Sequence, residues 1–137
     1  MEFITQNYFL IGAIVFVIIM IVGEPLRRRI LGIETATISE AVTMSNHEDA
    51  VFVDVRESKE VGDGGIIQGA MHIPLSSFKK NIGQIEKYKN KPVVVYCRSG
   101  QRSIGPAGTL KKAGFERVYN LTGGMIAWQK DSLPIQK

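Results

Sequence analysis

Two short apolar runs, Val51-Phe52-Val53 and Val93-Val94-Val95-Tyr96, most constrain the fold of this chain of 137 residues. Strands buried on both faces have such uninterrupted apolar sequences, and they belong mostly to parallel sheets. Further short strands are expected at 36–38, 70–73 and 117–120. Segments expected to be helical separate the strands, at 39–44, 56–61, 76–88, 103–113 and after 123. This alternation predicts a three-layer α/β domain with a mainly parallel sheet.

The start of the chain is uncharged and largely apolar from Phe3 to Gly23. As a helix, a segment of this length would span a bilayer at roughly 1.5 Å per residue. A cleaved signal peptide would place basic residues before the apolar run and a small-residue cleavage site after it. Here Glu2 comes before the run and the basic triplet 27–29 comes after it, which favours the cytoplasm for the C-terminal side.

We therefore expect a single-pass membrane anchor over residues 1–23 that contacts the bilayer through 3–23. A linker is expected over 24–36, with Pro25 ending the membrane helix. The remaining domain, 37–137, is expected on the cytoplasmic side of a bacterial inner membrane. A reducing cytoplasm also agrees with a single cysteine that remains a free thiol.

The charge and the few metal-binding residue types exclude several functions. Lys and Arg number 17 against 13 Asp and Glu, and three of the arginines are clustered at 27–29. No long basic run interleaved with aromatics occurs elsewhere, so a nucleic-acid partner is not expected. The single cysteine allows no internal disulfide. His47 and His72 are distant from each other and from Cys97 in sequence, so we expect neither a metal site nor a cofactor.

The candidate reactive group is Cys97, which follows the second apolar run and opens a loop of small and basic residues that leads into a helix. Ligands of parallel α/β sheets bind beyond the carboxyl ends of the strands. Helix amides and the guanidinium groups of Arg98 and Arg102 favour a thiolate, so the thiol pKa is expected below its ordinary value. A glycine- and arginine-bearing loop is unlike a core, which argues against a merely packed cysteine.

The loop from Cys97 to Arg102 can direct successive backbone N–H groups into one concavity that binds an anion. Gly100 allows the backbone to curl, and the two arginines can bind oxygens at the rim. One arginine could instead form a salt bridge with Asp54 or Glu57. Ser103 is expected to cap the following helix. The cysteine sulfur could attack an electrophilic sulfur and form a persulfide, whose charge the amides would stabilise.

Four segments, in order and spacing, resemble the rhodanese family of sulfurtransferases over roughly residues 35–133. They are Val53-Asp54-Val55-Arg56-Glu57, Ile67-Gln68-Gly69-Ala70-Met71-His72-Ile73-Pro74, Cys97-Arg98-Ser99-Gly100-Gln101-Arg102-Ser103 and Leu121-Thr122-Gly123-Gly124-Met125-Ile126-Ala127-Trp128. The chain departs from the family in one place, where Gly65-Ile66-Ile67 replaces the usual Gly-His-Ile.

This resemblance implies a five-stranded α/β domain in which Cys97 carries sulfane sulfur. It implies that the amides of Arg98, Ser99, Gly100, Gln101 and Arg102 cradle that sulfur. The two arginines would bind a donor such as thiosulfate or a persulfide. Asp54 and Arg56 match positions that brace the site in the family. The sulfur would then leave on an external thiol or on cyanide, because no second cysteine is present.

Two other functions are compatible with the sequence. Cysteine phosphatases and arsenate reductases share the anion-binding loop but place five residues between Cys and Arg, whereas four separate Cys97 from Arg102. A smaller ring of amides suits one sulfur atom better than a phosphate. The second alternative is a membrane-tethered interaction or sulfur-carrier module with little turnover, positioned beside a membrane-protein partner.

Overall fold

The computed structural model describes residues 1–137, except the side chains of residues 24, 27, 28, 30 and 31. Its main sheet has five strands in the order β1-β6-β5-β2-β4. All neighbouring strands in this sheet are parallel. The strands are β1 (Glu34–Ala36), β2 (Val51–Asp54), β4 (Met71–His72), β5 (Pro92–Tyr96) and β6 (Arg117–Leu121). The expected five-stranded, mainly parallel sheet is confirmed.

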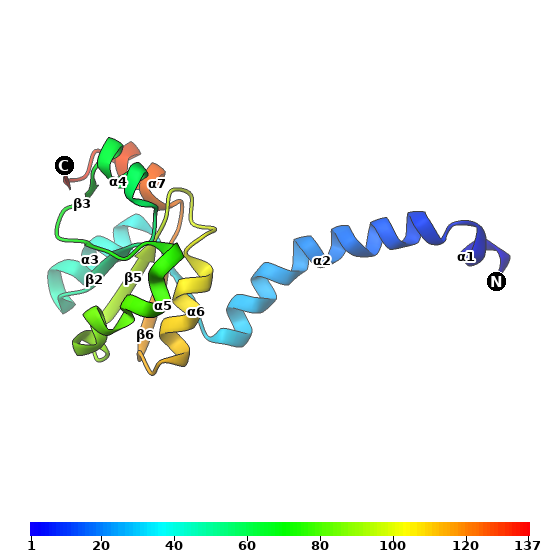
Figure 1. Cartoon of the computed structure of the whole chain (residues 1–137), viewed down its shortest axis with the longest axis horizontal. Coiled ribbons are helices and arrows are strands. Elements are labelled where there is room, and N and C mark those ends of the chain that lie inside the picture. The colour runs from blue at the N-terminus through cyan, green and yellow to red at the C-terminus, as the bar shows by residue number, and fades with distance from the viewer.

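Helices cover both faces of this sheet (Figure 1). One side carries α5 (Phe78–Asn81), the 3-10 helix η2 (Ile82–Tyr88) and α6 (Ile104–Lys112). The other side carries α3 (Ile38–Glu48) and α7 (Gly124–Lys130). The remaining elements of the domain are α4 (Ser58–Gly64), the 3-10 helix η1 (Leu75–Ser77) and an antiparallel pair, β3 (Ile66–Ile67) with β7 (Ile135–Gln136).

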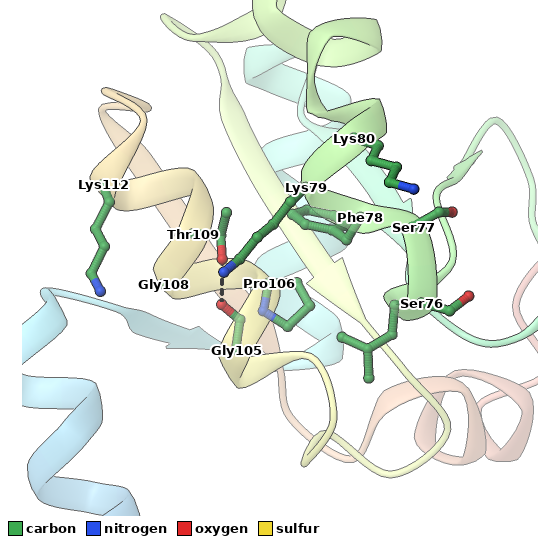
Figure 2. A pocket seen from close by; sticks show the side chains of 11 residues that line it. Ser76, Ser77, Phe78, Lys79, Lys80, Gly105, Pro106, Gly108, Thr109 and Lys112 are labelled. Carbon is green, nitrogen blue, oxygen red and sulfur yellow. Dashed lines mark hydrogen bonds between the residues drawn. The ribbon is translucent and has the colours of Figure 1, made fainter.

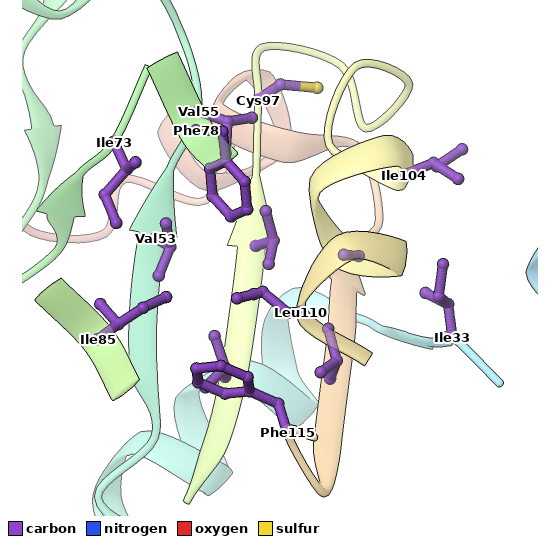
Figure 3. Close-up of a cluster of buried hydrophobic side chains, with 14 residues drawn as sticks. Ile33, Val53, Val55, Ile73, Phe78, Ile85, Cys97, Ile104, Leu110 and Phe115 are labelled. Carbon is purple, nitrogen blue, oxygen red and sulfur yellow. The ribbon is translucent and has the colours of Figure 1, made fainter. Parts of the chain in front are cut away.

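Successive residues of β5 alternate between the two cores, because side chains of a strand alternate between its faces. Val93, Val95 and then Cys97 belong to the cluster beneath α5 and α6, together with Phe78 and Leu110 (Figure 3). The cluster beneath α3 and α7 takes the alternate residues of the same strand. The central strand thus carries the cysteine to the carboxyl edge of the sheet, on the side of α6.

Several boundaries differ from the sequence-based expectations. The helix expected over 39–44 begins earlier and ends later as α3, and the hydroxyl of its N-cap residue Thr37 accepts a hydrogen bond from the Glu40 amide at 3.2 Å. The helix expected over 56–61 is displaced, because α4 runs from Ser58 to Gly64 and a capping box between Glu57 and Glu60 stabilises its start. The amphipathic helix expected over 76–88 is broken into short α and 3-10 segments, which Asn81 and Gly83 favour through their low helix propensity.

The N-terminal region differs most. The apolar run is not one helix, because α1 (Glu2–Gln6) ends at Asn7 and α2 (Tyr8–Leu31) begins after it. Pro25 lies inside α2 and does not end that helix as expected, and the segment 24–36 consists of the end of α2, a short turn and β1. Among the residues that the structure describes, no helix combines the length and the apolarity needed to cross a membrane, so the expected membrane anchor is not supported.

The helix α2 nevertheless extends away from the domain, and the two meet where its C-terminal end approaches α6 (Figure 1). Its large apolar side chains are exposed around the helix rather than packed on the domain. They are Tyr8, Phe9, Leu10, Ile14, Val15, Phe16, Val17, Ile18, Ile19, Met20, Ile21, Val22 and Leu26.

Candidate active site

Cys97 directly follows β5, the central strand, and it is fully buried. The adjacent ends of β2 and β6 supply Asp54 on one side and Asn120 on the other. All three residues lie at the same edge of the sheet because the strands are parallel. The position expected from the sequence, beyond the carboxyl ends of the strands, is where the structure has the thiol.

The loop that follows Cys97 is shaped by hydrogen bonds from α7. The amide of Met125 donates to the Cys97 carbonyl at 2.9 Å, and the amide of Ile126 donates to the Arg98 carbonyl at 3.1 Å. These two bonds hold the carbonyl groups of Cys97 and Arg98 toward α7. The Gly100 amide donates to the Cys97 Sγ at 3.1 Å. Gly100 has φ of +97°, a conformation that glycine adopts without strain.

A hydroxyl and an amide side chain complete the surroundings of the sulfur. The Ser103 Oγ lies 3.5 Å from the Cys97 Sγ and also hydrogen-bonds the Asn120 Oδ1. The Asn120 Nδ2 donates to the Gly100 carbonyl at 2.8 Å. Ser103 occupies the N-cap position of α6 but makes no side-chain cap, so its expected capping role is wrong. Asn120 was not among the expected site residues, although a polar residue at a buried position of β6 was a usable signal.

These contacts set the acidity of the thiol. Burial raises the pKa of Cys97, whereas the Ser103 hydroxyl and the backbone amides of Ser103, Gly100 and Ser99 lower it. The hydrogen bonds outweigh burial, and the pKa lies below the ordinary value of a cysteine. A lowered pKa was expected, but the neighbouring arginines are not its main cause.

The two loop arginines differ in their surroundings. The Arg102 guanidinium forms a bidentate salt bridge with Glu60 of α4, rather than with Asp54 or Glu57. This pairing lowers the pKa of Glu60 to about 2. Arg98 is exposed and, among the described side chains, forms no ion pair. Ser99 and Gln101 are also exposed, and of these two only the Ser99 backbone amide is among the groups that lower the pKa of Cys97.

Asp54 and Arg56 form a buried ion pair beside the loop. The Arg56 amide donates to Asp54 Oδ1 at 2.8 Å, and the Arg56 Nη2 donates to Asp54 Oδ2 at 2.7 Å and to the Gly65 carbonyl at 2.6 Å. The pair thus ties the end of β2 to the end of α4. Ile66, which stands where the family usually has histidine, belongs to β3 and pairs with Gln136 of β7.

Comparison with known proteins identifies the domain. The family model of the rhodanese-like domain matches residues 37–131. The chain belongs to this family. It is 36% identical over 100 residues to the thiosulfate sulfurtransferase GlpE of Glaesserella parasuis, covering 73% of this chain and 90% of the relative.

Two further relatives show how much of the chain is shared. The uncharacterized protein YibN of Escherichia coli is 31% identical over 135 residues, covering 98% of this chain and 94% of YibN. A solved rhodanese-like domain protein from Staphylococcus aureus superposes with a TM-score of 0.63 at 28% identity, covering 76% of this chain and 99% of that one. The YibN match therefore includes the N-terminal helices as well as the rhodanese-like domain.

Beside the loop, this rhodanese-like domain has a cavity of about 370 Å³ between α4 and α7. Arg56, Arg98, Glu60 and Asp63 contribute charged groups to its lining, and Met125 and Ile126 contribute apolar ones. Among the described residues, no group of three His, Cys, Asp or Glu side chains could hold a metal ion. The chemistry available at this edge of the sheet is that of a cysteine whose thiol pKa is lowered by hydrogen bonds, beside a cavity lined by both cationic and acidic side chains.

Proposed function

We propose that this rhodanese-like domain is a sulfurtransferase in which Cys97 accepts a sulfane sulfur from thiosulfate or a persulfide and passes it to a thiol or to cyanide. The observation that carries this proposal is the set of donors at the sulfur. The Gly100 amide and the Ser103 hydroxyl both reach the Cys97 Sγ. Such donors favour a thiolate and would stabilise the charge of the persulfide it forms.

The transfer takes place in two displacements. The Cys97 thiolate attacks the outer sulfur of thiosulfate, the S–S bond of thiosulfate breaks, and sulfite leaves with the bonding electron pair. The Cys97 persulfide is then attacked at its outer sulfur by cyanide or a thiolate. This step releases thiocyanate or a new persulfide and restores the thiolate, so no external oxidant or reductant is needed.

The roles of the arginines follow from charge. Thiosulfate is a dianion, and Arg98 lies exposed beside the loop with no ion pair among the described side chains. Arg102 is bound to Glu60, so it binds the donor only by sharing or exchanging that partner. Asp54 and Arg56 act as positioning residues that hold the end of β2 beside the loop.

The decisive experiment uses the purified full chain treated with thiosulfate and then analysed by mass spectrometry. We expect an addition of about 32 Da, one sulfur atom, on the peptide that contains Cys97. Addition of cyanide should remove it and release thiocyanate, and Cys97→Ser should do neither while keeping its circular dichroism. Equal thiocyanate release by Cys97→Ser would refute the mechanism. Phosphate release from an aryl phosphate without sulfur uptake would instead favour the phosphatase alternative.

We further propose that the domain is attached through α2 to a bacterial inner membrane and faces the cytoplasm. Two observations support this proposal. The sequence from Tyr8 to Gly23 has no charged residue, and its large apolar side chains are exposed. Exposed apolar patches of this extent on soluble proteins are rare and mark contacts with proteins or membranes. The arginines at 27–29 favour the cytoplasm for the domain.

Membrane attachment is tested by fractionating bacteria that produce the full chain. We expect the protein in the membrane pellet after washing with 1 M salt and after alkaline carbonate, because apolar contacts resist both. A control chain with Ile14, Phe16 and Ile18 changed to Asp should move to the supernatant. Release of the unchanged protein by carbonate would overturn the proposal. Protection of the domain from external protease in spheroplasts would support the cytoplasmic side, and digestion would contradict it.

A further inference from the structure

A second cavity, of about 420 Å³, lies between the segment after β4 and helix α6 (Figure 2). One of its walls is formed by residues 75–80, and the other by residues of α6 between Gly105 and Lys112. We name this cavity the lysine groove. None of its lining residues belongs to the loop after Cys97, so it is a surface distinct from the candidate active site. Its volume is sufficient for a small polar group such as a phosphate.

The lysine groove is positively charged. Its lining contains three lysines and no acidic residue. Lys79, Lys80 and Lys112 are all exposed, and none of them forms a salt bridge among the side chains that the structure describes. The Glu57 carboxylate accepts a hydrogen bond from the Ser76 Oγ at 3.2 Å, but Figure 2 shows Ser76 and Lys112 at opposite ends of the groove. A concave surface with charges of one sign attracts the opposite sign, here anions.

The end of α2 lies beside the lysine groove. Ile33, which follows α2 by two residues, is buried with Leu110 in the cluster beneath α6 (Figure 3). A Cβ on Gly32 would lie 3.3 Å from the Cε of Lys111, the residue before Lys112. The chain therefore passes from the exposed apolar helix directly onto the last turn of α6, which carries Lys111 and Lys112.

This connection limits how far the lysine groove can lie from a membrane that holds α2. Gly32 follows Gly23, the last residue of the uncharged run, by nine residues, which is about 14 Å at 1.5 Å per residue. The headgroup region extends about 5–7 Å beyond the hydrocarbon core on each side. The negative potential of anionic lipids reaches about 8 Å further at physiological salt. The lysine at the end of α6 is therefore within reach of this potential.

We infer that the lysine groove binds the headgroups of anionic phospholipids and holds the domain against the membrane to which α2 is attached. This inference rests on the proposed attachment through α2. The phosphate oxygens of the headgroups accept hydrogen bonds from the ammonium groups of Lys79, Lys80 and Lys112. Each lysine near an anionic surface strengthens binding about fivefold. With two points of contact, α2 and the groove, the domain has a fixed orientation on the membrane instead of rotating about the end of α2.

The test measures lysine reactivity in the full chain reconstituted into nanodiscs of phosphatidylcholine, alone or with about one-third phosphatidylglycerol. Acetylation followed by mass spectrometry gives a rate for each lysine. We expect Lys79, Lys80 and Lys112 to react about fivefold more slowly in the anionic discs, and about 0.5 M salt to restore their rates. Lys59 of α4 and Lys130 of α7 are exposed and lie outside the groove, so they are matched controls with equal rates in both discs.

A second measurement separates the lysine groove from α2. The full chain with the three aspartate substitutions in α2 described above keeps the groove but loses apolar contacts with the bilayer. We expect adding Lys79→Gln and Lys112→Gln to this chain to lower its partition onto anionic vesicles by about 25-fold in flotation. Lys59→Gln with Lys130→Gln is the matched control and should leave the partition unchanged. Circular dichroism checks that each variant is folded.

The outcomes distinguish the two proposals. Release of the unchanged protein by carbonate would remove the attachment through α2, and the docking that rests on it. With that attachment intact, equal acetylation rates of the groove lysines in the two kinds of disc would overturn only the docking. Equal partition of the groove and control variants would overturn it as well. Protection of the groove lysines in neutral discs by glycerophosphoglycerol, the soluble headgroup, would instead assign the groove to free phosphate compounds and refute a membrane contact.

Discussion

The Arg102 guanidinium donates two hydrogen bonds to the Glu60 carboxylate, from Nη1 to Oε1 and from Nη2 to Oε2, each 2.7 Å long. The bridge joins the loop after β5 to α4, two elements that lie 42 residues apart in sequence. Arg102 was expected to bind the sulfur donor, but in this structure its donors point to Glu60. A dianionic donor therefore competes with an internal carboxylate for the same guanidinium.

Removing the Glu60 carboxylate should strengthen the binding of thiosulfate, the sulfur donor, to Arg102. We expect Glu60→Gln to lower the KM for thiosulfate by about threefold, because an exposed ion pair of up to about 1 kcal/mol no longer competes. Arg102→Ala should raise that KM, since a charge-assisted contact with the dianion is lost. Steady-state thiocyanate formation measures both. A higher KM in Glu60→Gln would show that the bridge positions the loop rather than competing with the donor.

The salt bridge between Arg102 and Glu60 should make the stability of the fold depend on pH in the acid range. The pKa of Glu60 is lowered to about 2 in the folded protein, mainly by its hydrogen bonds with Arg102. A lowered folded-state pKa stabilises the fold above the unfolded value, near 4.5, and this contribution is lost as the pH falls toward about 2. We expect the difference in urea midpoint between the unchanged protein and Glu60→Gln to shrink between these values. It should remain constant from pH 6 to 8.

Ser103 should contribute measurably to the acidity of Cys97. Its hydroxyl is the strongest of the hydrogen bonds that lower the pKa of the thiol. We expect Ser103→Ala to move the pH profile of iodoacetamide alkylation upward by about one unit, because a hydrogen bond to a charged group is worth about 1.5 kcal/mol. Asn120→Ala, which releases Ser103, should also change the profile. Thr43→Ala, an exposed position on α3, is the control and should not change it.

These residues illustrate what the sequence could and could not predict. The sheet and the Cys97 loop were predictable because their signals are contiguous: apolar strands and an uninterrupted run of small and basic residues. Glu60 and Asn120 were not, because Glu60 lies 42 residues from Arg102 and Asn120 lies 17 from Ser103. Only the folded chain brings such partners together.

The errors at the N-terminus have a different origin. Composition shows that a segment is apolar, but it does not show where a helix begins or ends. The side chain and backbone amide of Asn7 both bond to the Phe3 carbonyl, which closes α1 and divides the run. Pro25 was expected to end a helix, yet α2 continues through it.

Gly124 should be intolerant of a side chain. A Cβ there would collide with the carbonyl of Cys97 and the backbone of Arg98, and its φ of +54° is already strained for other residues. We expect Gly124→Ala to destabilise the fold by about 2 kcal/mol or more and to reduce sulfur uptake. Gly83→Ala, where a Cβ meets nothing within 4 Å, is the matched control. Equal urea midpoints for the two variants would contradict this close approach.

The buried pair of Asp54 and Arg56 should show strong coupling. Asp54→Leu leaves the Arg56 guanidinium buried without its partner, which should lower the free energy of unfolding by about 3 kcal/mol or more. Adding Arg56→Met removes the uncompensated charge, so the double variant should recover part of that loss. A double-mutant cycle by urea denaturation measures the coupling. Additive effects would mean that the pair is not what holds β2 against α4.

The backbone hydrogen bonds from α7 to the loop after Cys97 make the surroundings of the thiol depend on a distant helix. The amides of Met125 and Ile126 hold the carbonyl groups of Cys97 and Arg98, although the two segments are far apart in sequence. The loop therefore depends on the docking of α7 for its shape. A change that loosens α7 should reach the thiol without touching any residue that contacts the sulfur.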